Sequence, residues 1–176
     1  MKSRSLMSTL IACVLVFAFA LISAPAASSA PKDNGIEKIT FFGENRSIAY
    51  VDLNAKPGDH GDKYFREVAL SKTINGPVIG VIYSQSEVVA FDPVTKTDVR
   101  RVHLQVMLPG GDLFFEGLSE VELGKPVTAG WSDTYAVVGG TGKYSGSTGT
   151  AKLTLLPGDK VFSWVIKLVR PAGFSN

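Results

Sequence analysis

The sequence is poor in cysteine and histidine, the residues that most often crosslink a small domain or hold a metal. It contains one cysteine, Cys13, and two histidines, His60 and His103. An internal disulfide needs two cysteines, and zinc or iron sites need several ligands at a recognisable spacing. The sequence therefore excludes an internal disulfide and contains no zinc or iron motif. We expect no metal site.

The sequence also lacks a hydrophobic run long enough to cross a membrane as a helix. Lys2 and Arg4 precede an apolar stretch over residues 10–22, and small residues follow over 23–30. A membrane span needs about 20 apolar residues, whereas this shorter pattern is typical of a secretory signal peptide. We predict a signal peptide over residues 1–30 and a secreted protein. Cleavage after Ala26 suits the A-x-A rule better than cleavage before a proline, and an uncleaved anchor is the alternative.

An excess of charge of one sign is missing once this leader is removed. The 18 Lys and Arg fall to 16, equal to the 16 Asp and Glu, and Cys13 is lost as well. Without a basic surplus there is no electrostatic case for nucleic acid, so we expect no nucleic-acid partner and no membrane span in the mature chain. About 145 residues suffice for one domain that is stable through its core alone.

No helical period is visible after a polar lead-in over residues 31–45, which we expect to be flexible. Polar and apolar residues alternate instead, and this period of two predicts strands separated by Pro, Gly and Asp turns. The predicted strands cover residues 47–54, 62–71, 78–91, 99–108, 113–123, 134–140, 148–157 and 160–170. Eight short strands favour an all-β antiparallel sandwich or closed barrel. Eight strands closed into a barrel leave an interior that is filled or holds one small ligand.

Glycine is concentrated in AVVGGTGKYSGSTGT, residues 136–150. The spacing does not complete a dinucleotide fingerprint, because Ser145 stands where the third glycine is needed, and it does not form a Walker loop. A phosphate cradle also uses a following helix, whereas residues 150–155 alternate like a strand. We predict a turn or bulge here, with Gly140 and Gly146 allowing positive φ or a close backbone approach.

Asp52 is the most unusual polar residue of the predicted strands. In SIAYVDLN, residues 47–54, it shares a face with Ile48 and Tyr50. If that face is interior, burial would favour the protonated acid and suit it to proton transfer near neutral pH. The alternative is that Asp52 only caps the turn that follows.

Two further acids and several tyrosines are weaker candidates. Glu67 alternates with Phe65 and Ala69, and Glu116 alternates with Phe114 and Leu118, so each lies either inside or on a solvated face. Tyrosine hydroxyls can bond a ligand oxygen, although buried tyrosines with ordinary partners are more common. The tyrosines considered are Tyr50, Tyr83 and Tyr135.

The stretch SDTYAVVGGTGKYSGSTGTAKLTL, residues 132–155, resembles the allene oxide cyclase and dirigent barrel superfamily. Residues 137–149 are similar to the V-V-G-G-T-G-K-F-x-x-A-x-G motif of dirigent proteins, and residues 131–149 to the D-T-Y-containing motif of the cyclases. The resemblance implies an eight-stranded antiparallel barrel over residues 46–176, with an apolar cavity and assembly into a homotrimer. It also aligns Asp52 with the acid of both families' first strand, and Asn54 with the cyclase asparagine.

The resemblance implies a protein that binds a small hydrophobic molecule, polyene, oxylipin-like or phenolic, and directs its stereoselective cyclisation or coupling without a cofactor. In this reading Asp52 is the catalytic residue. Substrate-binding residues would be Tyr50, Asn54, Glu67, Tyr83, Glu116, Tyr135 and Trp164. The alternative is a non-catalytic carrier of hydrophobic molecules, and a third hypothesis is a stable surface protein with a filled interior.

Overall fold

The computed structural model describes residues 35–53, 60–158 and 160–170. The predicted signal peptide and Asn54 lie outside these residues. Among the described residues, no helix has the length and hydrophobicity needed to cross a bilayer.

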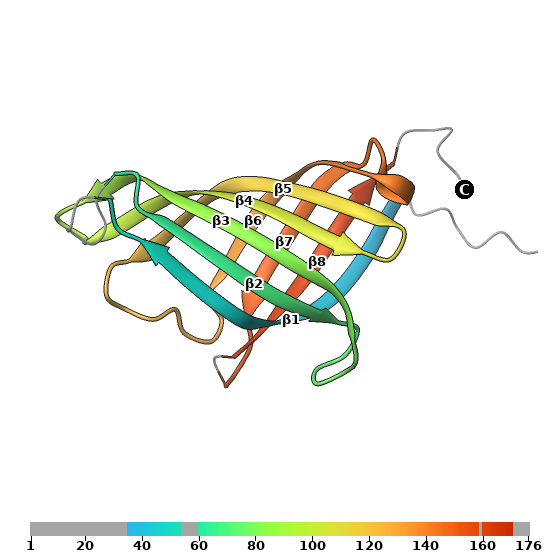
Figure 1. Ribbon diagram of the computed structural model, residues 1–176, viewed down its shortest axis with the longest axis horizontal. Helices are drawn as coiled ribbons and strands as arrows, with labels where there is room; N and C mark the ends of the chain where they lie inside the picture. The colour runs from blue at the N-terminus through green and yellow to red at the C-terminus, as the bar shows by residue number, and fades with distance from the viewer. Residues whose placement is uncertain (1–34, 54–59, 159, 171–176) are drawn as a thin grey trace, which may run out of the picture. The chain divides into compact units, whose positions relative to one another are not determined.

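Eight antiparallel strands form a closed barrel in the order β1 to β8, with each strand bonded to its sequence neighbours and β8 bonded to β1 (Figure 1). This confirms the predicted fold class. The strands are β1 (Ile36–Val51), β2 (Lys63–Ser71), β3 (Val78–Asp92), β4 (Thr97–Leu108), β5 (Gly111–Glu122), β6 (Ser132–Gly140), β7 (Thr148–Leu155) and β8 (Val161–Val169). One 3₁₀ turn, η1 (Gly142–Tyr144), separates β6 from β7.

Strand β1 is longer than the sequence pattern indicates. It begins at Ile36, so it covers most of the stretch expected as a flexible lead-in. Its first half pairs with β8, from Ile36 opposite Val169 to Glu44 opposite Val161, and its second half pairs with β2. The pairing with β8 joins the first and last strands, and a local alternation pattern carries no information about such a distant partner.

A β-bulge at Arg46 changes which residues of β1 face the interior. The register with β2 shifts between Asn45 and Ser47. Phe41 is buried on one side of the bulge, and Ile48 borders the internal cavity on the other, although their sequence parity differs. An extra residue in one strand has this effect because successive side chains point to opposite faces.

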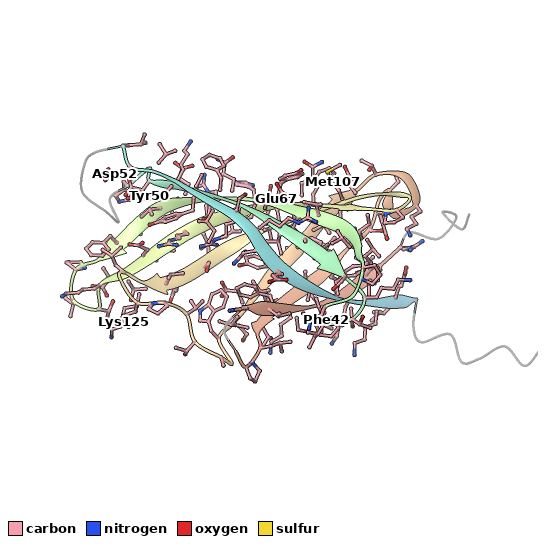
Figure 2. All side chains as sticks on the ribbon, turned by 60° about the horizontal axis from the view of Figure 1, so that its bottom comes forward. Phe42, Tyr50, Asp52, Glu67, Met107 and Lys125 are labelled. Carbon is pink, nitrogen blue, oxygen red and sulfur yellow. The ribbon has the colours of Figure 1, made fainter. Side chains whose placement is uncertain are left out.

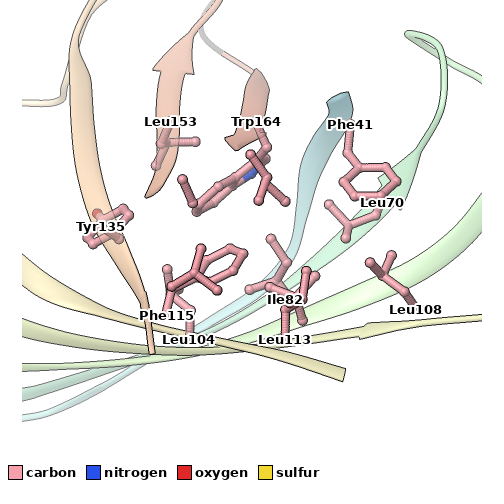
Figure 3. Packing of buried hydrophobic residues seen from close by; sticks show 14 of the residues in the cluster. Phe41, Leu70, Ile82, Leu104, Leu108, Leu113, Phe115, Tyr135, Leu153 and Trp164 are labelled. Carbon is pink, nitrogen blue, oxygen red and sulfur yellow. The ribbon is translucent and has the colours of Figure 1, made fainter. Parts of the chain in front are cut away.

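One end of the barrel, which we call the packed end, carries η1 and is filled with apolar side chains. Leu70, Leu113 and Leu168 have no exposed surface there, and Leu108 is also buried. Figure 3 shows Phe41, Leu70 and Leu108 together on one side of the buried cluster, with Tyr135 and Leu153 on the other. The other end, which we call the entrance end, carries residues 123–131 between β5 and β6.

The predicted alternation of faces is confirmed on the strands that line the core. On β4 the four apolar residues that alternate along one face are all buried, as are three of the four on β8. These residues are Val102, Leu104, Val106 and Leu108 on β4, and Trp164, Ile166 and Leu168, with partly buried Phe162, on β8.

The glycine-rich stretch forms a tight connection at the packed end, as predicted. Gly146 has a φ of 70°, a backbone conformation that favours glycine. A Cβ on Gly140 would lie 2.6 Å from the Tyr144 carbonyl oxygen, so no larger residue fits without a shift. Because strand β7 follows, this segment provides no helix N-terminus for a phosphate.

Candidate functional site

A cavity of about 610 Å³ occupies the barrel interior toward the entrance end. Small-molecule sites usually enclose about 300–1,000 Å³, so this volume suits one organic molecule. Residues 122–128 and Trp131 border it at the entrance, and Val68, Ile82 and Leu104 border it toward the packed end.

The side of the cavity formed by β6, β7, β8 and the segment before β6 is apolar. We call it the apolar wall, and its members are Trp131, Tyr135, Leu153, Leu155, Phe162 and Trp164. The Tyr135 and Trp164 rings stack with centroids 6.1 Å apart. Gly43 makes room for this arrangement, since a Cβ there would lie 2.8 Å from Val68 Cγ1 and 3.1 Å from Trp164 Nε1.

The cavity side formed by β2 to β5 carries polar side chains beside apolar ones such as Val102 and Leu104, and we call its polar residues the polar wall. Its members are Tyr64, Arg66, Ser84, Ser86, Arg100 and Ser119. Strand register makes them neighbours, because Tyr64 pairs with Ser86, Arg66 with Ser84 and Arg100 with Ser119. Side chains at paired positions of one face lie about 5 Å apart at Cβ, so the members of each pair are neighbours, and the Arg100 guanidinium over the Tyr64 ring connects the pairs.

Arg100 is held in place by a buried ion pair and an aromatic ring. Its Nη2 donates to Asp98 Oδ2 at 2.7 Å, and its guanidinium lies 4.0 Å from the Tyr64 ring centroid. Asp98 has no exposed surface and Arg100 is 7% exposed. A buried pair of this kind fixes the geometry of the wall, because neither charge can be left alone without a large cost.

Arg66 is the second cation of the polar wall, and its surroundings differ from those of Arg100. Within the described residues, no carboxylate lies within ion-pair distance of it. Burial lowers the pKa of its guanidinium, and the charge of Arg100 lowers it further. Arginine nevertheless stays protonated in proteins, so Arg66 places a positive charge in the cavity wall.

The Tyr135 hydroxyl belongs to a hydrogen-bonded cluster beside the cavity. It donates to Asp133 Oδ2 at 3.2 Å, and Ser119 Oγ donates to the same oxygen at 2.5 Å. Burial and then the charge of Asp133 raise the pKa of Tyr135. The phenol therefore remains neutral at physiological pH, so it serves as a hydrogen-bonding group and not as a base.

Near the end of β1, Tyr50 and Asp62 tie β1 to the start of β2. The Tyr50 hydroxyl donates to Asp62 Oδ2 at 2.6 Å, and the Leu53 amide donates to Asp62 Oδ1 at 3.1 Å. Asp62 has no exposed surface. Desolvation, followed by the hydrogen bond and charge of Asp62, raises the pKa of Tyr50. This cluster therefore braces the rim of the barrel.

Only some of the site residues predicted from the sequence line the cavity. Tyr135 and Trp164 line the cavity, whereas Tyr50 lies on its rim. Asp52 is exposed beyond Tyr50 at the end of β1, and Figure 2 shows the two together at the same end as Lys125. Asn54 lies outside the described residues.

The other three nominated residues point away from the cavity. Glu67 accepts a hydrogen bond from Arg46 at 3.3 Å, and Glu116 bonds His103 Nδ1 at 3.2 Å on the exposed outer wall. Tyr83 is 49% exposed on that wall. Glu67 on β2 and Glu116 on β5 both lie on the outer face of their strand. The expectation that these two acids line the interior therefore differs from the structure.

Sequence reasoning missed the charged residues of the interior, namely Asp62, Arg66, Asp98 and Arg100. Arg100 has the same parity as Val102 and Leu104, which was a usable signal. Strand β2 gave no clear signal, because Phe65 and Ala69 on one face balance Val68 and Leu70 on the other. Only the tertiary structure shows that Arg66 faces inward.

Groups of three or more His, Cys, Asp or Glu side chains able to hold a metal are absent from the described part of the chain. The described residues inside the cavity offer hydrogen bonding from serine and tyrosine hydroxyls, positive charge from two arginines, and contact with aromatic rings, and Glu122 and Lys125 lie at its entrance.

Comparisons with solved structures identify related barrels, although no protein-family model and no curated protein sequence matches the chain. A pyocyanin demethylase has a TM-score of 0.61 at 23% identity over 75% of this chain and 99% of its own. A nonspecific heme-binding cyclase that catalyses a 4 + 2 cycloaddition during neoabyssomicin biosynthesis has a TM-score of 0.62 at 16% identity, over 80% and 70%. A pterocarpan synthase dirigent protein has a TM-score of 0.59 at 15% identity, over 80% and 88%.

At these identities the likeness establishes the fold. The chain has a barrel of the kind found in dirigent proteins and cyclases, in agreement with that part of the sequence resemblance. A specific relation to allene oxide cyclases stays a prediction.

Proposed function

We propose that the barrel takes up one small, largely hydrophobic molecule and directs its cyclisation or coupling without a cofactor. The observation that carries this proposal is the two-sided cavity of about 610 Å³, with an apolar wall opposite a polar one. Such a site can hold a flexible molecule in one orientation, since ring contacts position its hydrocarbon part and hydrogen bonds position its oxygens.

The proposed catalysis depends mainly on shape. Holding a substrate in a conformer close to the reactive one removes conformational freedom before the chemical step, and this effect alone accounts for large rate gains in intramolecular reactions. The polar wall would add electrostatic stabilisation, because fixed donors aimed at a developing negative oxygen act strongly in a site sheltered from water. Arg66 and the serines of that wall are the donors we assign to this role.

The activities named for the neighbouring structures support this proposal. Their names refer to a pyocyanin demethylase, a cyclase that catalyses a cycloaddition and a pterocarpan synthase dirigent protein. Each of them acts on, or forms, a small organic molecule. A shared fold does not transfer a reaction, so the proposal for this chain depends on its own cavity.

A role for Asp52 in proton transfer stays a prediction. The residue is exposed and does not line the cavity, although it lies close enough to influence Tyr50 electrostatically. In Asp52→Asn, loss of turnover with unchanged ligand binding would support the role. Unchanged turnover would remove Asp52 from the mechanism.

A non-catalytic carrier is the second candidate, and a specific observation favours it. Among the described residues that line the cavity, the one acid is Glu122, which lies at the entrance and pairs with Lys125 at 2.5 Å. A cavity lining whose one described carboxylate is paired at the entrance, and whose Tyr135 phenol is neutral, has no ready general base.

The experiment that separates the two candidates starts from protein isolated from its source. Native mass spectrometry would identify a bound small molecule, which is then extracted and added back to ligand-free protein. Conversion to a cyclised or coupled product supports the first proposal, and recovery of the unaltered molecule supports the carrier. Protein with no bound molecule, and no affinity for the neutral fluorescent probe N-phenyl-1-naphthylamine, would contradict both.

A substitution that fills the cavity should abolish this binding. Ser84 is almost buried and borders the cavity, so Ser84→Trp is expected to place its indole where the ligand lies. We expect affinity for N-phenyl-1-naphthylamine to fall by at least about tenfold, because contact with the apolar wall is lost. The matched control is Tyr83→Trp, which changes the neighbouring residue on the outer wall. Equal losses in both variants would show that the probe binds elsewhere.

Secretion and assembly into a homotrimer also stay predictions. The outer wall carries exposed apolar side chains that a partner copy could cover, among them Phe65, Met107 and Leu118. Light scattering on the purified protein would measure the assembly, and a monomeric mass would exclude the trimer.

A further inference from the structure

Arg66 is the starting point, because the described residues leave its charge uncompensated inside the cavity wall. Its side chain is partly buried, and it borders the cavity together with Tyr64 and Tyr135. Placing a cation where water is restricted is costly unless an opposite charge compensates it. Close packing of side chains therefore does not explain why a charged residue occupies this position.

The second arginine of the same wall provides an internal comparison. Arg100 is paired with Asp98, so its charge is compensated within the protein. Both arginines have the same side chain and face the same cavity, yet the structure supplies a carboxylate for one of them only. Arg100 is therefore occupied by Asp98, whereas the guanidinium of Arg66 is available to bind a ligand.

The remaining acids near the cavity are already engaged. Asp133 accepts hydrogen bonds from Ser119 and Tyr135, and Glu122 pairs with Lys125 at the entrance. Asp62 accepts hydrogen bonds from the Tyr50 hydroxyl and the Leu53 amide. Among the charged residues that line the described part of the cavity, Arg66 is thus the one that lies in the interior and has no ion-pair partner.

Two other polar atoms of the polar wall also lack partners among the described residues. Ser86 Oγ and Arg100 Nε are buried and have no hydrogen-bond partner among the described residues. Ser86 is 2% exposed, and it lies diagonally across from Arg66 through the pairing of Arg66 with Ser84. Unsatisfied buried donors are uncommon in folded proteins, and they often mark a place where a ligand or a water binds.

From these observations, and resting on the function proposed above, we infer that the molecule bound in the cavity carries an ionised oxygen group that pairs with Arg66. A carboxylate or a phenolate would meet this requirement, with the hydrocarbon part against the apolar wall. Arg66 would then be the residue that selects an acidic ligand over a neutral one of similar shape. Guanidinium groups suit this role because their planar fork matches a carboxylate.

A pair of fluorescent probes tests the inference. The neutral N-phenyl-1-naphthylamine and the anionic 8-anilinonaphthalene-1-sulfonate differ by one sulfonate group, and both become bright in apolar sites. In Arg66→Gln we expect affinity for the anionic probe to fall by at least about tenfold, as for loss of a charge-assisted hydrogen bond, while affinity for the neutral probe changes by less than about twofold. Only binding that Ser84→Trp removes is counted.

The matched control is Arg101→Gln, because Arg101 is exposed on the outer face of β4 beside Arg100. This variant changes the net charge by the same amount, so it should leave both affinities unaltered. An equal loss of the anionic probe in Arg101→Gln, or no loss in Arg66→Gln, would overturn the inference while the proposed function stands. If neither probe binds the wild type in the cavity, the proposed function fails and the inference fails with it.

A second measurement uses the wild type alone, in case Arg66→Gln does not fold. Decanoate and decan-1-ol have the same chain and differ in charge. We expect decanoate to displace N-phenyl-1-naphthylamine at a concentration at least about tenfold lower, although the alcohol is the more hydrophobic of the two. Displacement by the alcohol at an equal or lower concentration would contradict selection for an acid.

Discussion

The two ends of the barrel are built from the same eight strands but are filled in different ways. At the packed end Leu70, Leu113 and Leu168 have no exposed surface. Toward the entrance end the inward positions of β2 to β5 become Arg66, Ser84 and Arg100, and a cavity replaces the core. A single strand therefore contributes both to stability and to the candidate site, depending on how far along it a residue lies.

The packed end and the cavity meet two different requirements, stability of the fold and space for a binding site. Close packing stabilises a fold, whereas a binding site needs empty volume and polar groups that packing would exclude. Because the packed core and the cavity lie toward opposite ends of the barrel, residues that line the cavity can be substituted at little cost to the packing of the core. Substitutions at the two ends should consequently affect different measurements.

The largest expected effect is on stability at the packed end. Leu113→Ala should lower the free energy of unfolding by about 3–5 kcal/mol, because a sealed core keeps most of the void. Leu153→Ala, the same change beside the cavity, should cost only about 2 kcal/mol, since the residue already borders open space. Urea unfolding measures both, and equal losses would show that the two ends do not differ in packing.

An intermediate effect is expected from the ion pair that holds the polar wall. Asp98→Ala leaves Arg100 without its carboxylate and should cost about 2–3 kcal/mol of stability, because a charged group loses its partner. The double variant Asp98→Ala, Arg100→Met removes both charges and should recover part of that loss. If the double variant is less stable than Asp98→Ala, the uncompensated arginine is not the cause.

The smallest effect concerns the pH dependence of stability, to which Tyr135 contributes. Burial and Asp133 raise the pKa of Tyr135 above the value of about 10 for an unfolded tyrosine. Its contribution is therefore fully present below pH 10, and it is lost as the pH rises from there through the higher folded value. The free energy of unfolding should fall above pH 10 by up to about 1.4 kcal/mol per pH unit from this group.

The phenylalanine variant isolates that contribution. Tyr135→Phe should flatten the alkaline fall, whereas Tyr83→Phe on the outer wall should follow the wild type. Identical alkaline slopes for all three proteins would show that Tyr135 does not contribute. Unfolding at several pH values between 8 and 11 provides the measurement.

Much of the fold could be predicted from the sequence, because strand alternation and turn residues are local signals. The buried faces of β4 and β8 followed from their period of two, and the glycines at 140 and 146 were recognised as parts of a tight turn. The start of β1 was not recognised, since its first half depends on pairing with β8 more than a hundred residues away.

The candidate site was harder to predict than the fold. Tyr135 and Trp164 were nominated and line the cavity, but Glu67, Tyr83 and Glu116 point outward. On β2 the two faces are similarly apolar, so alternation says which residues share a face but not which face is inside.

The sequence by itself determined that eight alternating strands form an all-β fold stable without disulfides, because side-chain period, turn chemistry and cysteine content belong to the chain. On strands with two similarly apolar faces, such as β2, only the tertiary structure decided which face points inward, and it alone decided where packing gives way to a cavity. The bulge at Arg46 and the closure of β1 on β8 set these features. They arise from contacts between distant segments, which no local pattern contains.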